Sequence, residues 1–293
     1  MKPFRTSERI RIPNIIHFVM IHKVPETANP LTFMQMIAIM SAAAANEPLS
    51  LYLHTNAEPY GQWWEFLRPL VTVRFISEIP TSWGSKPIIQ GAHLSDRVRM
   101  DILLEEGGIY LDFDVISLRP YRTLWTKQDG SPSLDGRGIP VEMIMGKEKE
   151  NGLCNAVMIS APNSTFLNIW KEEYEAAFDP KKWNEASVLL PKIISLKFPE
   201  MIKVVPESAF FLPSFTHTHL IFEDKYIELS ENAYAQHLWS APHIQHYMDP
   251  LAIWPMRSPP RNLFEKMIRF LAMNTSTWNS TIKDIFNLNS IVR

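Results

Sequence analysis

The order of apolar segments in the first part of the chain constrains the fold most strongly. Residues 12–20 are apolar and rich in β-branched side chains, which is typical of a buried strand, and residues 49–54 and 71–75 alternate apolar with polar side chains as further strands do. Residues 30–45 and 61–68 lie between them and have the apolar spacing of helices. Strands that alternate with helices in this way run parallel and are covered by helices on both faces. The sequence therefore predicts an α/β fold with a Rossmann-like sheet.

The rest of the chain continues this pattern less regularly. Residues 93–106 predict a helix, residues 107–115 a turn followed by a strand, and residues 123–138 a loop. Further strands are predicted over residues 141–145, 156–160, 203–206 and 234–239, and further helices over residues 165–178, 184–197 and 262–273. We therefore expect one domain over residues 1–255 and a helical extension over residues 256–293.

The helix predicted over residues 262–273 is amphipathic, and its polar side carries the basic residues Lys266 and Arg269. Two arrangements follow from this pattern. In the first, which we favour, the apolar face packs against the domain. In the second, the helix makes a peripheral contact with a membrane surface.

The composition limits the classes of protein to which the chain belongs. Its 293 residues are 46% hydrophobic and carry a formal net charge of −2, which fits a large core without a broad basic surface. We therefore expect no nucleic-acid partner. Cys154 is the single cysteine, which rules out an intrachain disulfide and fits a reducing compartment. Residues 1–11 have no apolar run behind them, so we expect no signal peptide and a cytoplasmic location, with peripheral membrane contact left open.

Two carboxylates, Asp112 and Asp114, follow a Gly-Gly turn and a short apolar strand. Side chains alternate between the faces of a strand, so Tyr110, Asp112 and Asp114 are expected on one face and the apolar residues between them in the core. Ligands of open α/β sheets bind at the carboxyl ends of the strands, which is where this pair falls. Two like charges repel unless a cation lies between them, and a hard divalent ion with a phosphate is the usual partner. A pair of this kind also occurs as a turn cap or on a solvated surface, so the flanking residues decide between these interpretations.

Five motifs together resemble a known enzyme family. They are Ile-Pro-x-Ile-Ile-His-Phe at residues 12–18, Leu-Ser-Asp-x-x-Arg at 94–99, Gly-Gly-Ile-Tyr-Leu-Asp-x-Asp at 107–114, Asn-Ala-Val-Met at 155–158 and His-Leu-Trp at 237–239. This set is similar to the retaining glycosyltransferases of family 32, which carry an Asp-x-Asp sugar-nucleotide motif. The family includes initiating α-1,6-mannosyltransferases and α-1,4-galactosyltransferases, and the catalytic domain of clostridial glucosylating toxins is similar in the same motifs. The second and third motifs, taken together, are the specific ones.

The resemblance covers about residues 12–240 and implies a fold and a reaction. The implied fold is the GT-A type, with a Rossmann-like mixed sheet and helices on both faces. The implied reaction moves a hexose from a UDP- or GDP-sugar to an acceptor hydroxyl, with retention of the anomeric configuration. The acceptor would be a glycan, a lipid or a protein.

The resemblance also implies a metal site. Asp112 and Asp114 would be catalytic residues that hold Mn²⁺ or Mg²⁺ on the donor diphosphate, where the ion neutralises charge on the leaving group. Asp112 would in addition contact the ribose or the sugar. A C-terminal residue, often histidine, commonly completes the metal site of such enzymes, which points to His237. His243 and His246 in the same segment are competitors for this role.

Four residues near the acidic pair are candidates for donor binding. Asp96 and Arg99 are three apart on the predicted helix and share one face. They form either a surface ion pair of little energetic importance or, as the resemblance implies, contacts to sugar hydroxyls and phosphate oxygens. Ser95 is either a helix cap or a nucleotide contact. Tyr110 either lines the donor pocket or buries its ring.

The resemblance implies four further roles. His17 and Met20 would line the nucleotide-base site at the end of the first strand, although toxin-like relatives carry a Trp at the position of Met20. Trp239 would stack against the donor, unless it fills the core. Asn155 would lie close to the reacting sugar and is counted as catalytic.

We therefore expect a glycosyltransferase of glycan, polysaccharide or glycolipid synthesis. One alternative is toxin-like glycosylation of a host protein, and another is a sugar-nucleotide-binding protein without transfer activity. Trp63, Trp64 and Trp83 either belong to the core, which we favour, or bind acceptor sugars.

Overall fold

A computed structural model describes residues 11–22, 29–149, 152–223, 230–239 and 262–274, the last five of these without side chains. The strands are β1 (Ile15–Met20), β2 (Ser50–Thr55), β3 (Thr72–Phe75), β4 (Ser82–Trp83), β5 (Lys86–Pro87), β6 (Gly108–Leu111), β7 (Val115–Ser117), β8 (Met143–Glu148), β9 (Gly152–Ser160), β10 (Lys203–Val205) and β11 (Ala235–His237). The α-helices are α1 (Phe33–Asn46), α2 (Gln62–Leu67), α3 (Gly91–Glu106), α4 (Thr165–Ala177), α5 (Leu190–Lys197) and α7 (Leu263–Asn274). Shorter helical turns are η2 (Tyr121–Leu124), η3 (Glu185–Leu189), η4 (Pro199–Met201), η5 (Glu207–Ala209) and η6 (Phe215–Ile221).

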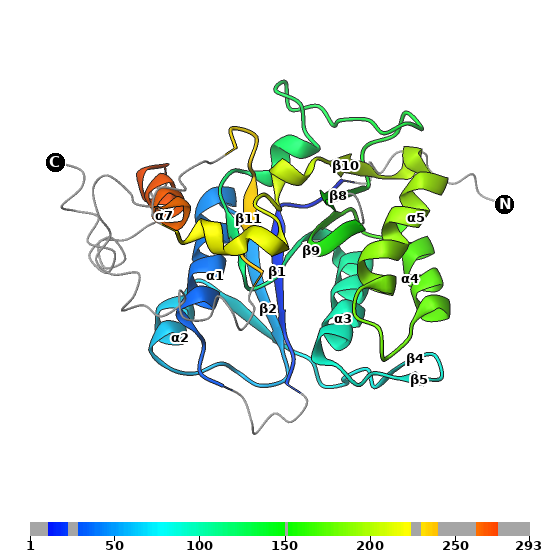
Figure 1. The fold of residues 1–293 in the computed structure, drawn as a ribbon, viewed down its shortest axis with the longest axis horizontal. Coiled ribbons are helices and arrows are strands. Elements are labelled where there is room, and N and C mark those ends of the chain that lie inside the picture. The colour runs from blue at the N-terminus through cyan, green and yellow to red at the C-terminus, as the bar shows by residue number, and fades with distance from the viewer. Residues whose placement is uncertain (1–10, 23–28, 150–151, 224–229, 240–261, 275–293) are drawn as a thin grey trace.

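The centre of the fold is a mixed sheet of seven strands in the order β10-β8-β9-β6-β1-β2-β3. The strands β1, β2, β3 and β6 run parallel, whereas β9 is antiparallel to both of its neighbours. Helices α1, α2 and α7 lie on one side of the sheet and α3, α4 and α5 on the other (Figure 1). The predicted α/β fold, with a mixed sheet and helices on both faces, is confirmed.

Strand alternation divides the interior into two cores. Ile109 and Leu111 of β6 pack with α1, while Tyr110 between them packs with the core that lies under α3 and α4. Val157 and Ile159 of β9 also face the first core. Each central strand is therefore buried on both faces, which is why these strands read as continuous apolar runs.

Two glycines connect α3 to β6. Gly107 has φ +69° and Gly108 has φ +104°, and both values are strained for residues with a side chain. A Cβ on Gly108 would lie 2.7 Å from the carbonyl oxygen of Ile15, and one on Gly107 would lie 2.7 Å from the backbone nitrogen of Pro162. Glycine at these positions lets α3 end close to the sheet. As a result, the earlier turns of α3 lie alongside β6.

Three local predictions differ from the structure. The helix predicted over residues 184–197 is a π-helical turn, η3, followed by α5, because Pro191 has no N–H to donate and marks the first turn of a new helix. The loop predicted over residues 123–138 begins inside η2 and contains two isolated bridges, Thr126 with Pro132 and Leu134 with Pro140. The strand predicted over residues 234–239 is limited to β11, which pairs with β7 outside the main sheet.

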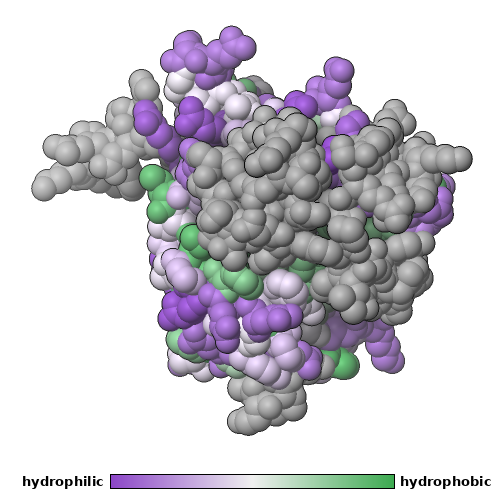
Figure 2. Space-filling model, turned by 90° about the vertical axis from the view of Figure 1, so that its left-hand side faces the viewer, coloured by the Kyte–Doolittle hydropathy of each residue, from purple (hydrophilic) through white to green (hydrophobic). Residues whose placement is uncertain are grey.

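The C-terminal helix α7 packs against the domain. Leu263, Phe264, Met267 and Ile268 are buried in the first core, and the Phe264 ring stacks on Phe222 with centroids 5.5 Å apart. The described residues on the left-hand side of Figure 1 show hydrophobic areas interspersed with hydrophilic ones (Figure 2). None of the described helices combines the length and the apolar character that crossing a bilayer requires. The domain boundary predicted at residue 255 lies outside the described residues.

Candidate functional site

Asp112 and Asp114 lie in a turn rather than in a strand. Strand β6 ends one residue before Asp112, and the N–H of Val115 donates to the Asp112 carbonyl at 3.2 Å. The alternation of strand faces therefore does not position Asp114, and that part of the sequence prediction was wrong. The position of Asp114 is instead fixed by β11, because its carbonyl accepts a hydrogen bond from the N–H of Leu238 at 2.8 Å.

The same pairing brings His237 to the acidic turn. His237 is opposite Val115 in the β7–β11 ladder, and its Nε2 lies 3.1 Å from Asp114 Oδ1. One ligand atom from each of Asp112, Asp114 and His237 lies within 4.8 Å of the other two. Burial lowers the pKa of His237, but the Asp114 carboxylate more than offsets this and raises the pKa above its ordinary value. His237 Nδ1 is buried and has no hydrogen-bond partner among the described residues.

A second group of polar residues surrounds Asp96, which is buried on α3 and 4% exposed. Asp96 Oδ1 accepts a hydrogen bond from Asn155 Nδ2 at 2.7 Å, and Oδ2 accepts one from the Tyr174 hydroxyl at 2.7 Å. Arg99 Nη2 lies 3.6 Å from Asp96 Oδ1. The pair predicted on one helix face is therefore buried and bonded to β9 and α4, which excludes the surface ion pair.

Arg99 connects this group to the acidic turn. Its Nη1 donates to the Asn155 carbonyl at 2.8 Å, and its Nη2 lies 3.0 Å from Ser95 Oγ and 3.2 Å from Asp112 Oδ1. The guanidinium lies over the Tyr110 ring, 4.2 Å from its centroid, and the Tyr110 hydroxyl donates to Asp112 Oδ1. Both of these contacts to Asp112 fall on Oδ1 and leave Oδ2 without a bond from this group. We call Asp96, Arg99, Tyr110, Asn155 and Tyr174, together with Ser95, the Arg99 network.

Both burial and neighbouring charges shift the pKa values of Arg99 and Asp112. Burial alone would lower the pKa of Arg99, but Asp112, Tyr110 and Asp96 raise it above the ordinary value, so the guanidinium stays charged. Burial raises the pKa of Asp112; Arg99 opposes this rise and the nearby Asp114 carboxylate adds to it. A buried carboxylate beside a second carboxylate is stabilised when a cation binds next to it.

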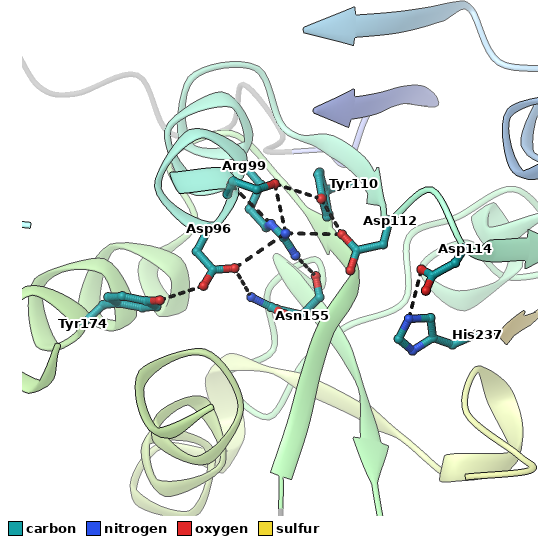
Figure 3. Close-up of polar contacts among 9 residues, drawn as sticks. Asp96, Arg99, Tyr110, Asp112, Asp114, Asn155, Tyr174 and His237 are labelled. Carbon is teal, nitrogen blue, oxygen red and sulfur yellow. Dashed lines mark hydrogen bonds and ion pairs between the residues drawn. The ribbon is translucent and has the colours of Figure 1, made fainter. Parts of the chain in front are cut away.

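One cavity of about 410 Å³ joins the two groups. Asp112 lies between the Arg99 network and the Asp114–His237 pair (Figure 3). The lining residues are Ala92, Asp96, Arg99, Asp112, Asp114, Glu148, Cys154, Asn155, Trp183, Asn184, Ser187, Val188, Phe215, His237 and Trp239. They include four carboxylates and a single guanidinium. Two carboxylates and one imidazole within a negatively charged cavity are ligands that fit Mn²⁺ or Mg²⁺.

His17 and Met20 do not line this cavity. His17 is buried, with Nε2 3.0 Å from the Gly107 carbonyl and Nδ1 3.0 Å from His54 Nε2. A carbonyl only accepts, so His17 Nε2 carries the proton and His54 Nε2–H donates to His17 Nδ1. Burial lowers the pKa of His17 to about 4 and that of His54 to about 3, so both are neutral at pH 7. Met20 is partly buried at the end of β1, where it packs on the first core.

The predicted aromatic residues divide between the core and the cavity. Trp239 lines the cavity, with its ring centroid 4.0 Å from that of His237. Trp64 and Trp83 are buried, and Trp63 packs against Phe33 with centroids 5.3 Å apart, so these residues belong to the core as we favoured. The competing ligands His243 and His246 lie outside the described residues.

The sequence analysis missed several lining or supporting residues. Tyr174, which bonds Asp96, and Glu148, which lines the cavity, belong to no recognised motif. Burial raises the pKa of Glu148, and burial followed by the Glu148 charge raises that of Cys154. Trp183 was detectable, because it is an isolated aromatic residue in a charged turn over residues 179–184, which is typical of exposure at a binding site.

Comparisons with known proteins identify the family of this chain. A family model described as "Glycosyltransferase sugar-binding region containing DXD motif" matches residues 35–131. The "Glucan organizing enzyme 1" of Cryptococcus neoformans var. grubii serotype A is 30% identical over 267 residues, which span 88% of this chain and 70% of the relative.

Solved structures of glycosyltransferases are similar at a greater distance. The apo-form of GlyE from Streptococcus pneumoniae TIGR4 matches with a TM-score of 0.48 and 14% identity over 95% of this chain and 64% of that chain. The galactosyltransferase LgtC, in complex with donor and acceptor sugar analogs, matches with a TM-score of 0.46 and 11% identity over 92% of this chain and 99% of that chain.

Proposed function

Because the chain belongs to the glycosyltransferases that carry a DXD sugar-binding region, we propose that it moves a hexose from a UDP- or GDP-sugar to an acceptor hydroxyl, with a divalent metal ion and retention of configuration. The observation that carries this proposal is a single cavity in which Asp112 is next to both the Arg99 network and the Asp114–His237 pair. Sugar hydroxyls and a metal-bound diphosphate need these two kinds of site side by side.

The Arg99 network supplies the sugar side. A carboxylate only accepts hydrogen bonds, so Asn155 Nδ2 faces Asp96 and its amide oxygen is left for a donor hydroxyl. Asp96 is bonded at both oxygens and can accept further bonds through its remaining lone pairs. Arg99 is bonded to protein groups, so its role is to hold Asp112 ionised and in position rather than to bind phosphate directly.

Asp112, Asp114 and His237 would hold the metal ion on the other side. When bound, such an ion neutralises the negative charge of a leaving diphosphate. Asp112 Oδ2 and the Asp114 carboxylate are presented by one turn, and His237 is added by the β7–β11 ladder. The turn is anchored on both sides, so little rearrangement is needed to bring the three groups to one ion.

The acceptor side needs no strong base from the protein. In a retaining transfer, the departing phosphate oxygen takes the proton of the acceptor hydroxyl on the face where the donor bond breaks. The name of the 30% identical relative, a glucan organizing enzyme, supports a saccharide product over a modified host protein.

The first test is Asp114→Asn. We expect this variant to lose Mn²⁺-dependent release of UDP or GDP from a panel of UDP- and GDP-hexoses by at least about 10²–10³-fold. Its Tm should stay close to that of the wild type, because the substitution keeps the shape of the side chain. Asp129→Asn in an exposed turn is the matched control and should keep full activity. Full turnover by Asp114→Asn would refute the assignment.

A further inference from the structure

The outer part of the cavity carries an aromatic residue that none of the steps above uses. Trp183 lines the cavity and is 66% exposed. It lies between α4 and η3. An exposed indole at a polar cavity offers a flat apolar face on which a ligand in that cavity can stack.

Buried neighbours support the position of Trp183. Its ring centroid lies 6.2 Å from that of His93, which packs edge-on against Phe178 with centroids 5.1 Å apart. Trp170 Nε1 donates to the Ala186 carbonyl at 3.0 Å and ties the start of η3 to the core. The indole is therefore presented by a fixed segment, which reduces the entropy lost when a ligand stacks on it.

Glu148 and Ser187 belong to the same part of the cavity. Glu148 is paired with Gly152 in the sheet, and Val188 of η3 packs on that glycine, with Cγ1 2.1 Å from where a Cβ would lie. Only glycine lets η3 approach β9 this closely. As a result, Glu148, Ser187 and Val188 line one wall together with Trp183. We call these four residues the Trp183 wall.

We propose that the Trp183 wall is the acceptor subsite and that it takes an uncharged pyranose. This inference rests on the proposed transferase function. The apolar C–H face of the sugar ring would stack on the Trp183 indole, and its hydroxyls would bond to the Glu148 carboxylate and the Ser187 hydroxyl. A flat apolar surface with polar groups at its edge matches a pyranose, whose ring face is apolar and whose rim carries the hydroxyls.

The charge of the cavity excludes acidic sugars. Among the described lining residues, Asp96, Asp112, Asp114 and Glu148 are acidic, and Arg99 is the one guanidinium. A donor diphosphate adds further negative charge, which a divalent ion offsets only in part. An acceptor with a carboxylate would therefore meet like charges at Glu148, and such contacts reduce affinity.

The exposure of Trp183 places the acceptor, rather than the donor, on this wall. The donor sugar and diphosphate are assigned to the Arg99 network and to Asp112, Asp114 and His237. The Trp183 wall is the part of the cavity lining that these assignments leave for the second substrate. A stacking residue on this wall contributes to acceptor affinity without contact to the nucleotide.

Saturation-transfer difference NMR on the full chain tests this assignment. The protein is loaded with UDP or GDP and Mg²⁺, which unlike Mn²⁺ leaves the spectra sharp. Methyl α-D-glucopyranoside, methyl α-D-mannopyranoside and methyl β-D-galactopyranoside are the neutral probes, and methyl β-D-glucuronide is the charged one. We expect at least one neutral pyranoside to bind and the glucuronide to bind more weakly.

Substitutions distinguish the loss of stacking on Trp183 from a general effect of removing an exposed aromatic side chain. Trp183→Ala should weaken pyranoside binding roughly tenfold, and Trp183→Phe should restore part of it. Phe75→Ala removes an aromatic side chain that is 64% exposed on β3, and it should bind pyranosides as the wild type does. Equal pyranoside binding by Trp183→Ala and Phe75→Ala, or no binding of any neutral probe, would overturn the acceptor assignment.

A thermal-shift measurement on the same samples separates the two proposals. A rise in Tm with UDP or GDP and Mg²⁺ reports the donor site through mass action. If the nucleotide stabilises the chain while the pyranoside result is negative, the inference about the Trp183 wall fails and the proposed function stands. If neither nucleotide stabilises the chain, both proposals fail. A loss of the nucleotide effect in Trp183→Ala would assign Trp183 to the donor and overturn the acceptor assignment.

Discussion

The Arg99 side and the His237 side of the cavity differ in how completely their polar atoms are bonded. Asp96 is bonded at both oxygens, and Arg99 bonds to a carbonyl, a hydroxyl and a carboxylate. His237, in contrast, contacts Asp114 through Nε2, while its buried Nδ1 has no partner among the described residues. The polar atoms of the first side are mostly bonded within the protein, whereas the second side has a buried imidazole nitrogen without a partner among the described residues. We infer that the Arg99 side sets the shape of the site and that the His237 side binds the ion.

The largest expected loss of stability comes from a substitution on the Arg99 side. Arg99→Met removes the cation next to Asp96 and Asp112 and leaves the buried Asp96 carboxylate, and the partly exposed Asp112 carboxylate, without this charge partner. Breaking a buried ion pair in this way costs about 3–5 kcal/mol of unfolding free energy. Urea unfolding followed by circular dichroism measures this loss.

Arg68→Met is the matched control for this substitution. Arg68 pairs with Glu58 at 2.6 Å on the surface, and an exposed pair of this kind contributes about 0–1 kcal/mol. If the two variants unfolded at the same urea concentration, the Arg99 network would not be the stabilising side, and the comparison would lose its basis.

Sequence periodicity predicted the strands of the sheet and the shared helix face of Asp96 and Arg99, because both depend on local patterns. Apolar runs locate the strands, and the i, i+3 spacing puts Asp96 and Arg99 on one helix face. The Gly-Gly turn then brings α3 beside β6, so Arg99 reaches Asp112 across a short connection. These contacts follow from residues that are close together in the sequence.

The rest of the site depends on contacts between distant segments. Asp114 and His237 are 123 residues apart and meet through a three-residue ladder outside the main sheet. His17 was assigned to the donor site on resemblance alone, and the structure places it against His54, 37 residues away. Gly152, which pairs with Glu148, lets η3 approach the sheet, and Ser187 and Val188 of η3 line the cavity. No local pattern encodes these pairings.

A smaller effect is expected within the Arg99 network from Tyr174→Phe. The hydroxyl of Tyr174 donates to Asp96 Oδ2 at 2.7 Å, and its ring stacks on Trp83 with centroids 4.3 Å apart. Phenylalanine keeps the stacking and removes one bond to a buried carboxylate, which costs about 1–3 kcal/mol. The same unfolding measurement tests this value. Tyr60→Phe, at an exposed tyrosine, should change nothing measurable, and an equally stable Tyr174→Phe would show that Asp96 does not need this donor.

The smallest expected effect is a pH dependence that the His237 side of the cavity should show and the Arg99 side should not. Asp114 raises the pKa of His237, so in the absence of metal the protonated imidazole contributes stability below about pH 6.5, and this contribution is lost as the pH rises through the raised pKa. A metal ion binds the unprotonated ring, so Mn²⁺ affinity should fall by up to about tenfold per pH unit below that pKa. The charge of Arg99 does not change in this range, because its pKa is raised further above neutrality.

Calorimetric titration of Mn²⁺ between pH 6 and pH 8.5 measures this slope. His237→Gln should bind Mn²⁺ more weakly and with a flatter pH dependence, since glutamine does not titrate. His219→Gln changes a half-buried histidine outside the cavity, whose Nε2 lies 3.8 Å from Glu223 Oε1, and it should keep the wild-type slope. An unchanged slope in His237→Gln would mean that another group, such as Asp112 with its raised pKa, competes with the ion for a proton. The His237 side would then be an acidic turn alone, and the imidazole would only support its shape.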